Sequence, residues 1–309
     1  MNGNCTLFER SGLDVLVPRN LLEVFDMKLE DWIGRTEEIT DTATPTPCAA
    51  LSATFDQDAR RPEAGAPLPP LWHWLYFLPL VQRSDIGADG HARRGGFLPP
   101  VPLPRRMWAG SQFEFHQPLR IGDALVRRST IQDVTEKSGR TGPLVFVKVR
   151  HEIRRAGEAD LALTEWHDIV YREAAQPGDA APTPRPAPTD AAWEKPWVPD
   201  DVLLFRYSAL TFNGHRIHYD RQYVTEVEGY PGLVVHGPMV ATLLLELLRE
   251  RLPGAQLQSY EFRAVRPLFD IHAFAVCGRP EADGKTVRLW ARDHQGWLAM
   301  EATAVIGGS

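Results

Sequence analysis

Several stretches of the chain alternate between apolar and charged residues, which is the pattern of a half-buried antiparallel strand. Along residues 143–153 (PLVFVKVRHEI) the apolar side chains fall on one face and the charged side chains on the other. The apolar face consists of Val145, Val147, Val149 and Ile153, and the charged face of Lys148, Arg150 and Glu152. Residues 163–173 (LTEWHDIVYRE) predict its partner, and residues 285–293 and 296–306 predict a closing hairpin around the turn sequence His-Gln-Gly.

One segment has the spacing of a helix. Residues 238–254 (PMVATLLLELLRERLPG) place apolar side chains at helical intervals, with Pro238 in the first turn and Gly254 at the C-terminal exit. The apolar positions include Met239, Leu243, Leu244, Leu247 and Leu248. Because this helix is apolar around most of its circumference, we expect an antiparallel sheet to wrap around it. A similar helix is expected in the first half at residues 68–82 (LPPLWHWLYFLPLVQ), although Pro79 interrupts its pattern.

The chain divides into two halves joined by a segment rich in Pro and Ala. Residues 174–197 contain few large apolar side chains and predict an extended linker between an N-terminal domain, 1–173, and a C-terminal domain, 198–309. A weak internal repeat supports this division. Residues 113–131 and 260–278 share an aromatic–Glu–Phe start and a Pro, and each predicts a strand, a bend and a second strand.

The composition is that of a soluble globular protein. The 309 residues are 43% hydrophobic and have a formal net charge of −6, which argues against nucleic-acid binding. The three cysteines, Cys5, Cys48 and Cys277, are widely separated and odd in number, so they predict no disulfide framework and favour the cytoplasm. The N-terminal segment is too charged for a signal peptide, and no apolar run is long enough to predict a membrane span or a membrane partner.

Residues 210–239 concentrate proton-handling side chains just before the predicted helix. Three histidines, His215, His218 and His236, are enough for an open zinc site. However, Arg216 and Arg221 lie among them in the sequence and disfavour a divalent ion, and the pattern HExxH is missing. We therefore expect neither a metal nor any other cofactor.

The second interpretation is an acid–base site, and the third is a loop of ordinary hydrogen-bonded polar residues. A histidine both accepts and donates a proton near neutral pH. The amide of Asn213 is suited to hold a water molecule, and Gly237 at the helix start offers a free backbone N–H and the helix dipole to an oxyanion. A base, a water-holding amide and an oxyanion site are the groups needed to add water to a double bond conjugated with a thioester.

The segments 212–218 (FNGHRIH) and 229–239 (GYPGLVVHGPM) resemble the active segment of the (R)-specific enoyl-thioester hydratases of the MaoC-like hotdog group. That segment runs Asp-x-Asn-Pro-(aliphatic)-His and is followed about 18 residues later by His-Gly. The resemblance implies that His218 is the family histidine, Asn213 stands at the family aspartate, and Gly237 is the oxyanion glycine. His215 replaces the family asparagine and Arg216 the family proline.

The form FNxHRIHYD, preceded by RYSALT at 206–211, is similar to the branch of hydroxyacyl-thioester dehydratase type 2 and the itaconyl-CoA, mesaconyl-C4-CoA and 3-methylfumaryl-CoA hydratases. In the first half, 73–79, 89–123 and 138–153 resemble the N-terminal region of the same branch, so the similarity extends from about residue 31 to the C-terminus. It implies an α+β double hotdog, two antiparallel sheets each wrapped around a long helix. It also implies an acyl-CoA substrate, with acyl carrier protein as an alternative carrier, and is compatible with a homodimer.

The replacement of Asp by Asn changes the expected chemistry, since Asn213 cannot exchange a proton. We expect His218 to be the acid–base residue, Asn213 to position water, and His215 and His236 to assist. The first half lacks an equivalent set and is expected to be non-catalytic. Three arginines, Arg105, Arg106 and Arg216, are candidates to bind coenzyme A phosphates or a free carboxylate on the acyl group.

The predicted activity is that of a hydro-lyase that hydrates a short enoyl-CoA, in particular a branched C4–C5 dicarboxylic one such as itaconyl-CoA, mesaconyl-C4-CoA or 3-methylfumaryl-CoA. A thioesterase on the same fold is an alternative, although the helix that starts at Gly237 contains no acidic residue before Glu246. A non-catalytic acyl-CoA-binding protein is the third hypothesis, because the family aspartate is replaced.

Overall fold

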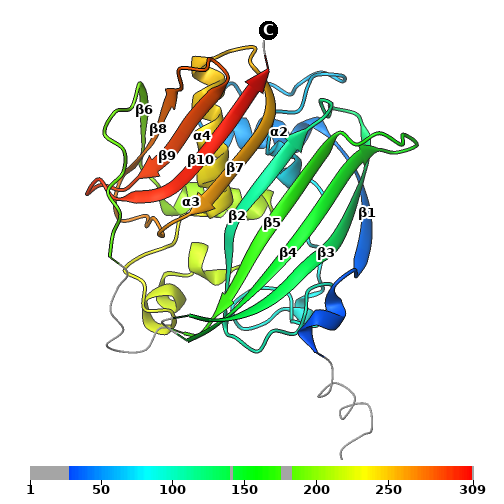
Figure 1. The fold of residues 1–309 in the computed structure, drawn as a ribbon, viewed down its shortest axis with the longest axis vertical. Coiled ribbons are helices and arrows are strands. Elements are labelled where there is room, and N and C mark those ends of the chain that lie inside the picture. The colour runs from blue at the N-terminus through cyan, green and yellow to red at the C-terminus, as the bar shows by residue number, and fades with distance from the viewer. Residues whose placement is uncertain (1–27, 140–141, 175–182, 308–309) are drawn as a thin grey trace, which may run out of the picture.

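The computed structural model describes residues 28–139, 142–174 and 183–307. Its strands form one ten-stranded sheet in the order β1-β3-β4-β5-β2-β7-β10-β9-β8-β6 (Figure 1). The strands are β1 Thr36–Thr42, β2 Arg105–Phe115, β3 Ala124–Gly139, β4 Gly142–Arg155, β5 Leu163–Arg172, β6 Trp193–Trp197, β7 Gln256–Ala264, β8 Phe274–Pro280, β9 Thr286–Arg292 and β10 Leu298–Gly307. The α-helices are α2 Pro45–Thr54, α3 Asp201–Leu210 and α4 Gly237–Arg251.

The elements with the clearest sequence patterns form as predicted. The alternating segment 143–153 lies in β4 and pairs antiparallel with β5, for example at Val147 and Ile169. The closing hairpin is β9 and β10. The predicted apolar helix is α4, and Gly254 follows it with a φ of +89°, a backbone conformation that glycine adopts without strain.

The internal repeat corresponds to a real symmetry of the sheet. In each half the repeat forms a strand, a bend and a second strand: β2 and β3 in the first half, and β7 and β8 in the second. Its two aligned first residues, Phe113 and Tyr260, pair with each other across β2 and β7. A local two-fold axis therefore passes through this pair, and the two half-sheets join there into one continuous sheet.

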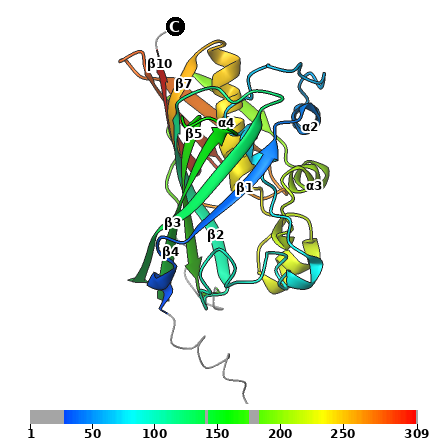
Figure 2. The same cartoon turned by 90° about the vertical axis from the view of Figure 1, so that its right-hand side faces the viewer.

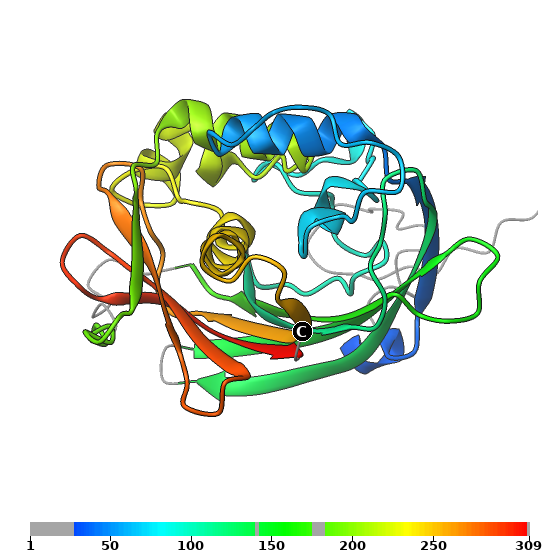
Figure 3. The same ribbon diagram turned by 90° about the horizontal axis from the view of Figure 1, so that it is seen from above.

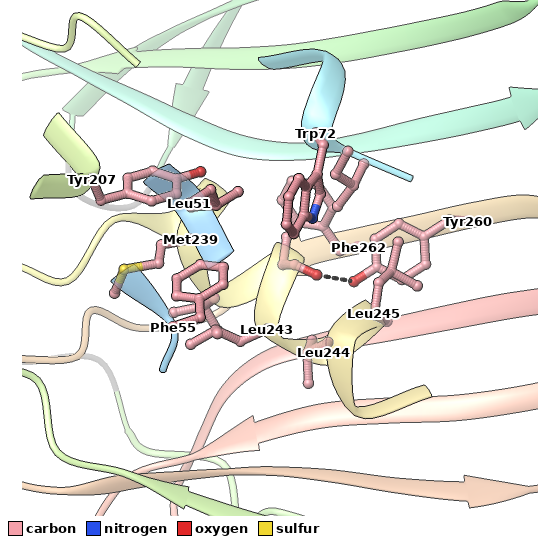
Figure 4. Packing of buried hydrophobic residues seen from close by; sticks show 14 of the residues in the cluster. Leu51, Phe55, Trp72, Tyr207, Met239, Leu243, Leu244, Leu245, Tyr260 and Phe262 are labelled. Carbon is pink, nitrogen blue, oxygen red and sulfur yellow. Dashed lines mark hydrogen bonds between the residues drawn. The ribbon is translucent and has the colours of Figure 1, made fainter. Parts of the chain in front are cut away.

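The helices all lie on the concave side of the sheet (Figure 2). Seen from above, α4 lies against the second-half strands, and α2 and α3 form an outer layer beyond it (Figure 3). The core packs around α4, where Leu243 and Leu244 are buried together with Trp72, Tyr260 and Phe262 (Figure 4). Because Trp72 comes from the first half, this core holds the two halves together.

A polar contact inside this core also joins the halves. Glu246 on α4 is 3% exposed and accepts hydrogen bonds from Trp72 Nε1 at 2.9 Å and from Gln57 Nε2 at 2.7 Å, and it pairs with Arg249. The buried carboxylate is thus fully engaged in structural contacts, two of them with the first half.

None of the described helices combines the length and the apolar character that crossing a bilayer requires.

The first half differs from its prediction in one respect. The described part of the first half has no long helix at 68–82. Only Trp72–Leu75 form a 3₁₀ turn there, with Leu71 and Phe77 in left-handed conformations on either side. Prolines at positions 69, 70 and 79 remove backbone donors and prevent a continuous helix. Space therefore remains beneath the first-half sheet.

The predicted linker is shorter than expected. Residues 193–197, placed in the linker by composition, form β6, which pairs with β8 at the edge of the second-half sheet. Pro196 fits there because an edge strand does not need every backbone donor. Residues 175–182 lie outside the described part of the chain, as do Cys5 and the charged N-terminal segment.

Candidate active site

The loop that contains Asn213 is fixed where it leaves α3. The N–H of Asn213 donates to Ser208 O at 2.8 Å and the N–H of Phe212 donates to Ala209 O at 3.3 Å, the two bonds of a Schellman motif. The N–H of His215 donates to Asn213 Oδ1 at 3.0 Å. Because that oxygen must be the acceptor, the Asn213 amide nitrogen is oriented as a donor and remains available for another group.

His218 lies in the next turn and is held through one ring nitrogen. Its Nδ1 donates to the carbonyl oxygen of Val234 at 2.7 Å, since a carbonyl can only accept. Val234 in turn donates its N–H to Ile217 O at 2.9 Å, which fixes the two segments to each other. The imidazole is 7% exposed, and burial lowers the pKa of His218 to about 4 despite the opposing effect of the Val234 bond. The side chain is therefore neutral at pH 7, with Nε2 unprotonated.

His236 lies behind His218. The two imidazoles stack with centroids 3.7 Å apart and planes at 18°. His236 is fully buried, and its Nε2 forms a hydrogen bond with Ser208 Oγ at 2.8 Å. Burial and the neighbouring histidines lower the pKa of His236, so both stacked rings stay neutral. His236 thus supports the plane of His218, and it is not among the residues that line the cavity beside His218.

Gly237 is the first residue of α4, directly after His236. Its N–H precedes the first possible intrahelical bond, and Pro238, the next residue, has no N–H. A Cβ added to Gly237 would meet no atom within 4 Å, so the space beside its Cα is open, and Gly237 lines the cavity. The helix dipole gives this end of α4 a partial positive charge. These are the properties expected of an oxyanion site.

A loop of the first half, residues 85–93, packs directly on the Asn213–His218 loop. Gly90 has a φ of +89°, and a Cβ there would lie 1.8 Å from Gly214 O. Arg216 donates its backbone N–H to Asp89 O at 2.9 Å and its Nη1 to Ala88 O at 3.0 Å. Only a glycine at position 90 permits so close an approach of the two loops.

This contact brings two unpredicted residues of the first half to the site. Asp89 Oδ2 accepts a hydrogen bond from His91 Nδ1 at 2.9 Å, and the His91 ring lies 4.0 Å from the ring of His215. His215 is in turn 5.4 Å from His218, centroid to centroid. Burial and the neighbouring histidines lower the pKa of His215 to about 2, and burial likewise lowers the pKa of His91.

The donor atoms of Asp89, His91 and His215 lie within 4.8 Å of one another, a spacing that a metal ion could use. This is a different set from His215, His218 and His236, which the sequence suggested. Their chemistry fits a divalent ion poorly, because Asp89 is already bound by His91 and the positive charge of Arg106 acts on both His91 and His215.

The three candidate arginines have different surroundings. Arg105 pairs with Glu228, through the carboxylate at 3.1 Å and the backbone carbonyl at 2.8 Å. Arg216 pairs with Asp220 at 2.7 Å and lies over the ring of Tyr223. Both guanidinium groups are thus held by neighbouring residues of the second half. Arg106 lines the cavity.

The cavity itself has a volume of about 2170 Å³ and is lined by both halves. Asn213, His215, His218 and Gly237 lie along its second-half wall. The space left by the missing first-half helix extends it under the other half-sheet. Its size is sufficient for an extended thioester ligand.

A polar cluster forms the first-half wall. Glu165 on β5 is 3% exposed and contacts His73 Nε2 at 3.1 Å, Trp74 Nε1 at 3.2 Å and Ser111 Oγ at 3.4 Å. Burial alone would raise the pKa of Glu165, but the His73 bond and the nearby imidazoles lower it to about 2. The same wall includes His151 and His167. Sequence analysis missed this cluster, because its members come from strands and turns far apart in the chain. Asp89 and His91 could have been found in the sequence, because they stand two residues apart in a Gly-rich polar segment, ADGHARRGG.

Comparison with known proteins agrees with this architecture. The structure is similar to HtdX of Mycobacterium tuberculosis, with a TM-score of 0.60 and 18% identity over 87% of this chain and 99% of that one. It is also similar to a conserved M. tuberculosis protein with a double hotdog fold, with a TM-score of 0.55 and 14% identity over 92% of this chain and 98% of that one. These neighbours establish the double hotdog fold.

Two sequence matches are more specific. The family model of hydroxyacyl-thioester dehydratase type 2 matches residues 71–270. The chain is 48% identical over 280 residues to the mesaconyl-C(4)-CoA hydratase of Chloroflexus aurantiacus, covering 90% of this chain and 97% of that protein. It is 28% identical over 235 residues to the mitochondrial hydroxyacyl-thioester dehydratase type 2 of Schizosaccharomyces pombe, covering 68% of this chain and 77% of that protein.

Fold and sequence together define the class as the MaoC-like hotdog hydratases and dehydratases of acyl thioesters. Within that class, the chain belongs to the hydroxyacyl-thioester dehydratase type 2 family. It is therefore an enzyme of the hydro-lyase class.

Proposed function

We propose that the protein adds water reversibly to the double bond of a short, branched dicarboxylic enoyl-CoA, and that mesaconyl-C4-CoA is its substrate. The observation on which this rests is the arrangement of His218. Its Nδ1 is bound to Val234 O, so its unprotonated Nε2 is the nitrogen left for a water molecule in the cavity. The 48% identity to a protein named mesaconyl-C(4)-CoA hydratase supports the choice of acyl group.

The proton transfers follow from these positions. The Asn213 amide nitrogen donates to the water oxygen, and His218 Nε2 takes one water proton as the O–H bond breaks. The resulting hydroxide adds to the β-carbon. The electron pair of the double bond then forms a bond between the α-carbon and the carbonyl carbon, and the carbonyl π pair moves to the thioester oxygen. The Gly237 N–H stabilises that oxygen at the N-terminus of α4. His218 then returns its proton to the α-carbon, which restores the thioester and leaves the enzyme unchanged.

The polar wall of the cavity supports a short substrate. A long apolar acyl chain that extended into the first half would meet Glu165 and its imidazole neighbours. Contact of methylene groups with a buried ionised carboxylate gives no hydrophobic stabilisation and weakens the hydrogen bonds of that carboxylate. A C4–C5 acyl group avoids this region.

Thioester hydrolysis has less support. The acidic residue on α4 that would activate water for hydrolysis, Glu246, is bound by Trp72 and Gln57 and does not line the cavity. The hypothesis of a non-catalytic acyl-CoA-binding protein would require that His218 takes no part in proton transfer. However, its imidazole is neutral and its Nε2 is free, so His218 is a competent base.

We also propose that the carrier is coenzyme A and that the protein works in the cytoplasm, where the two buried thiols Cys48 and Cys277 stay reduced. Acyl carrier protein is the alternative carrier. A homodimer of two chains stays a prediction. Light scattering during size-exclusion chromatography would test the homodimer.

A panel of thioesters tests the function. The purified protein is incubated with mesaconyl-C4-CoA, itaconyl-CoA, 3-methylfumaryl-CoA, crotonyl-CoA and a C12 enoyl-CoA, and loss of the conjugated absorbance is followed. We expect the highest kcat/KM with mesaconyl-C4-CoA and the lowest with the C12 substrate. Free thiol is measured in parallel. Thiol release without hydration would establish a thioesterase, and no turnover of any substrate would reject the proposal.

A further inference from the structure

The positive charges around the cavity are not equivalent. Arg105 is paired with Glu228, Arg216 with Asp220, and Arg127 with Glu37 at 3.9 Å. Arg94 donates to the backbone carbonyls of Val101 and Pro104. Each of these guanidinium groups already has an acceptor supplied by the protein.

Arg106 lines the cavity, and among the described residues no carboxylate lies within 4.0 Å of its guanidinium group. Arg83, Arg93 and Arg172 also line the cavity without such a partner, but of these four only Arg106 acts by its charge on both His91 and His215. Arg106 lies opposite Tyr171 in the β2–β5 pairing, and the Tyr171 hydroxyl lies beside its guanidinium group. Tyr171 is 1% exposed and therefore a rigid support. A half-buried cation that faces a cavity without a counter-ion is suited to an anionic ligand.

The position of Arg106 also relates it to the reacting groups. The cavity wall that contains Arg106 continues to His91 and His215, whose ring is 5.4 Å from that of His218. Burial lowers the pKa of His91 and of His215, and the nearby positive charge of Arg106 lowers both further. The guanidinium group is thus near His91 and His215, in the cavity that His218 also lines.

We propose that Arg106 binds the free carboxylate of the substrate and is the residue that selects a dicarboxylic acyl group. The inference rests on the proposed function. In mesaconyl-C4-CoA the free carboxylate is attached to the β-carbon, the atom to which water adds. A cation that holds this carboxylate fixes the β-carbon beside the water on His218.

A second effect follows from charge. A carboxylate on the β-carbon repels an approaching hydroxide, and it also disfavours the negative charge that develops on the thioester. Arg106 neutralises the carboxylate in a site from which water is largely excluded, where the interaction is stronger than in bulk solvent. The non-catalytic half thereby supplies the substrate-selecting cation, and the catalytic half supplies the base.

Binding of coenzyme A phosphates is the competing role for Arg106, and a matched pair of substrates separates the two. Crotonyl-CoA has no free carboxylate, and it shares with mesaconyl-C4-CoA all of coenzyme A and the double bond conjugated with the thioester. If Arg106 binds the carboxylate, its loss affects one substrate. If it binds coenzyme A, or if it only maintains the fold, its loss affects both.

The experiment measures kcat/KM of the wild type, Arg106→Gln and Arg106→Lys on both thioesters. For Arg106→Gln we expect a decrease of about 10- to 150-fold with mesaconyl-C4-CoA, the range for one lost hydrogen bond to a charged group. With crotonyl-CoA the change should be less than about threefold. Arg106→Lys keeps the charge and loses the planar fork, so it should fall between the two. If Arg106→Gln does not fold, Arg106→Lys still tests the proposal.

Arg105→Gln is the control for loss of charge at the adjacent position. Because Arg105 is bound to Glu228, its loss should change kcat/KM for both thioesters by the same factor. An equal decrease with both substrates for the Arg106 variants, or no decrease with either, would overturn the inference. A wild-type enzyme that hydrates crotonyl-CoA but none of the three dicarboxylic thioesters of the panel would instead reject the dicarboxylic substrate class, and this role of Arg106 with it.

Discussion

The Nδ1 atom of His218 donates a hydrogen bond to the carbonyl oxygen of Val234 at 2.7 Å. This single contact fixes both the tautomer and the direction of the ring. The proton on Nδ1 cannot leave without loss of a buried hydrogen bond, so Nε2 is the nitrogen that exchanges protons. The acid–base function predicted for His218 therefore depends on a backbone atom 16 residues away.

His218→Ala removes the proposed base. We expect turnover of mesaconyl-C4-CoA to fall by about 10²–10⁴-fold, the usual contribution of general acid–base catalysis. KM should change little, because the imidazole acts on water rather than on coenzyme A. Steady-state kinetics check this, with circular dichroism to verify the fold and His294→Ala, an exposed histidine in the β9–β10 turn, as a matched control. Near-normal turnover in a folded His218→Ala variant would remove His218 from the mechanism.

Asn213 is expected to position water without transferring a proton. Asn213→Ala should lower kcat by about 10²-fold, since loss of orientation alone has effects of this size. Asn213→Asp retains the oxygen that accepts from the His215 N–H and restores the carboxylate of the more common family pair, so substantial activity should survive. Steady-state kinetics of the two variants, measured side by side, test whether Asn213 positions water. An inactive Asp variant and an active Ala variant would contradict the positioning role.

The pH at which catalytic activity is lost should lie below the ordinary pKa of histidine. Because burial lowers the pKa of His218 from 6.5 to about 4, the base stays unprotonated at pH 5–7 and activity is lost only as pH falls through about 4. Stability behaves differently. The unfolded histidine binds a proton below 6.5 and the folded one does not, so the free energy of unfolding decreases as pH falls below 6.5. kcat/KM for crotonyl-CoA should therefore be measured from pH 4 to 8 on samples shown to be folded. A midpoint near 6.5 would mean that His218 is not buried as described.

The contact between the two halves can be tested at Gly90. Gly90→Ala would place a methyl group 1.8 Å from Gly214 O at a φ of +89°, so the first-half loop must move away from the Asn213–His218 loop. We expect kcat to fall by about 10²-fold and Tm to decrease. Gly96→Ala, where an added Cβ meets nothing within 4 Å and φ is ordinary, is the control and should be neutral. Unchanged kinetics of Gly90→Ala would show that this contact does not position the catalytic loop.

Much of the architecture is determined locally and could be predicted. Alternation along β4, the apolar circumference of α4 and the repeat at Phe113 and Tyr260 depend on the periodicity of side chains, which the sequence displays directly. His218, Asn213 and Gly237 could be proposed as one site because they are close in the sequence and precede a helix. The structure places all three along the same cavity wall.

Other features depend on contacts between distant segments. The sequence places Arg105 and Arg106 together, yet successive residues of a strand point to opposite faces, so Arg105 meets Glu228 while Arg106 faces the cavity. The missing first-half helix follows from prolines, but the space it leaves under the sheet depends on how the halves pack. The contact of Gly90 with Gly214, which adds Asp89 and His91 to the site, requires two loops more than a hundred residues apart to meet. The sequence by itself thus determined the elements with a clear periodicity and the segment that contains the proposed catalytic residues. Tertiary structure alone decided which charges face the substrate, because burial and pairing are properties of the space between segments.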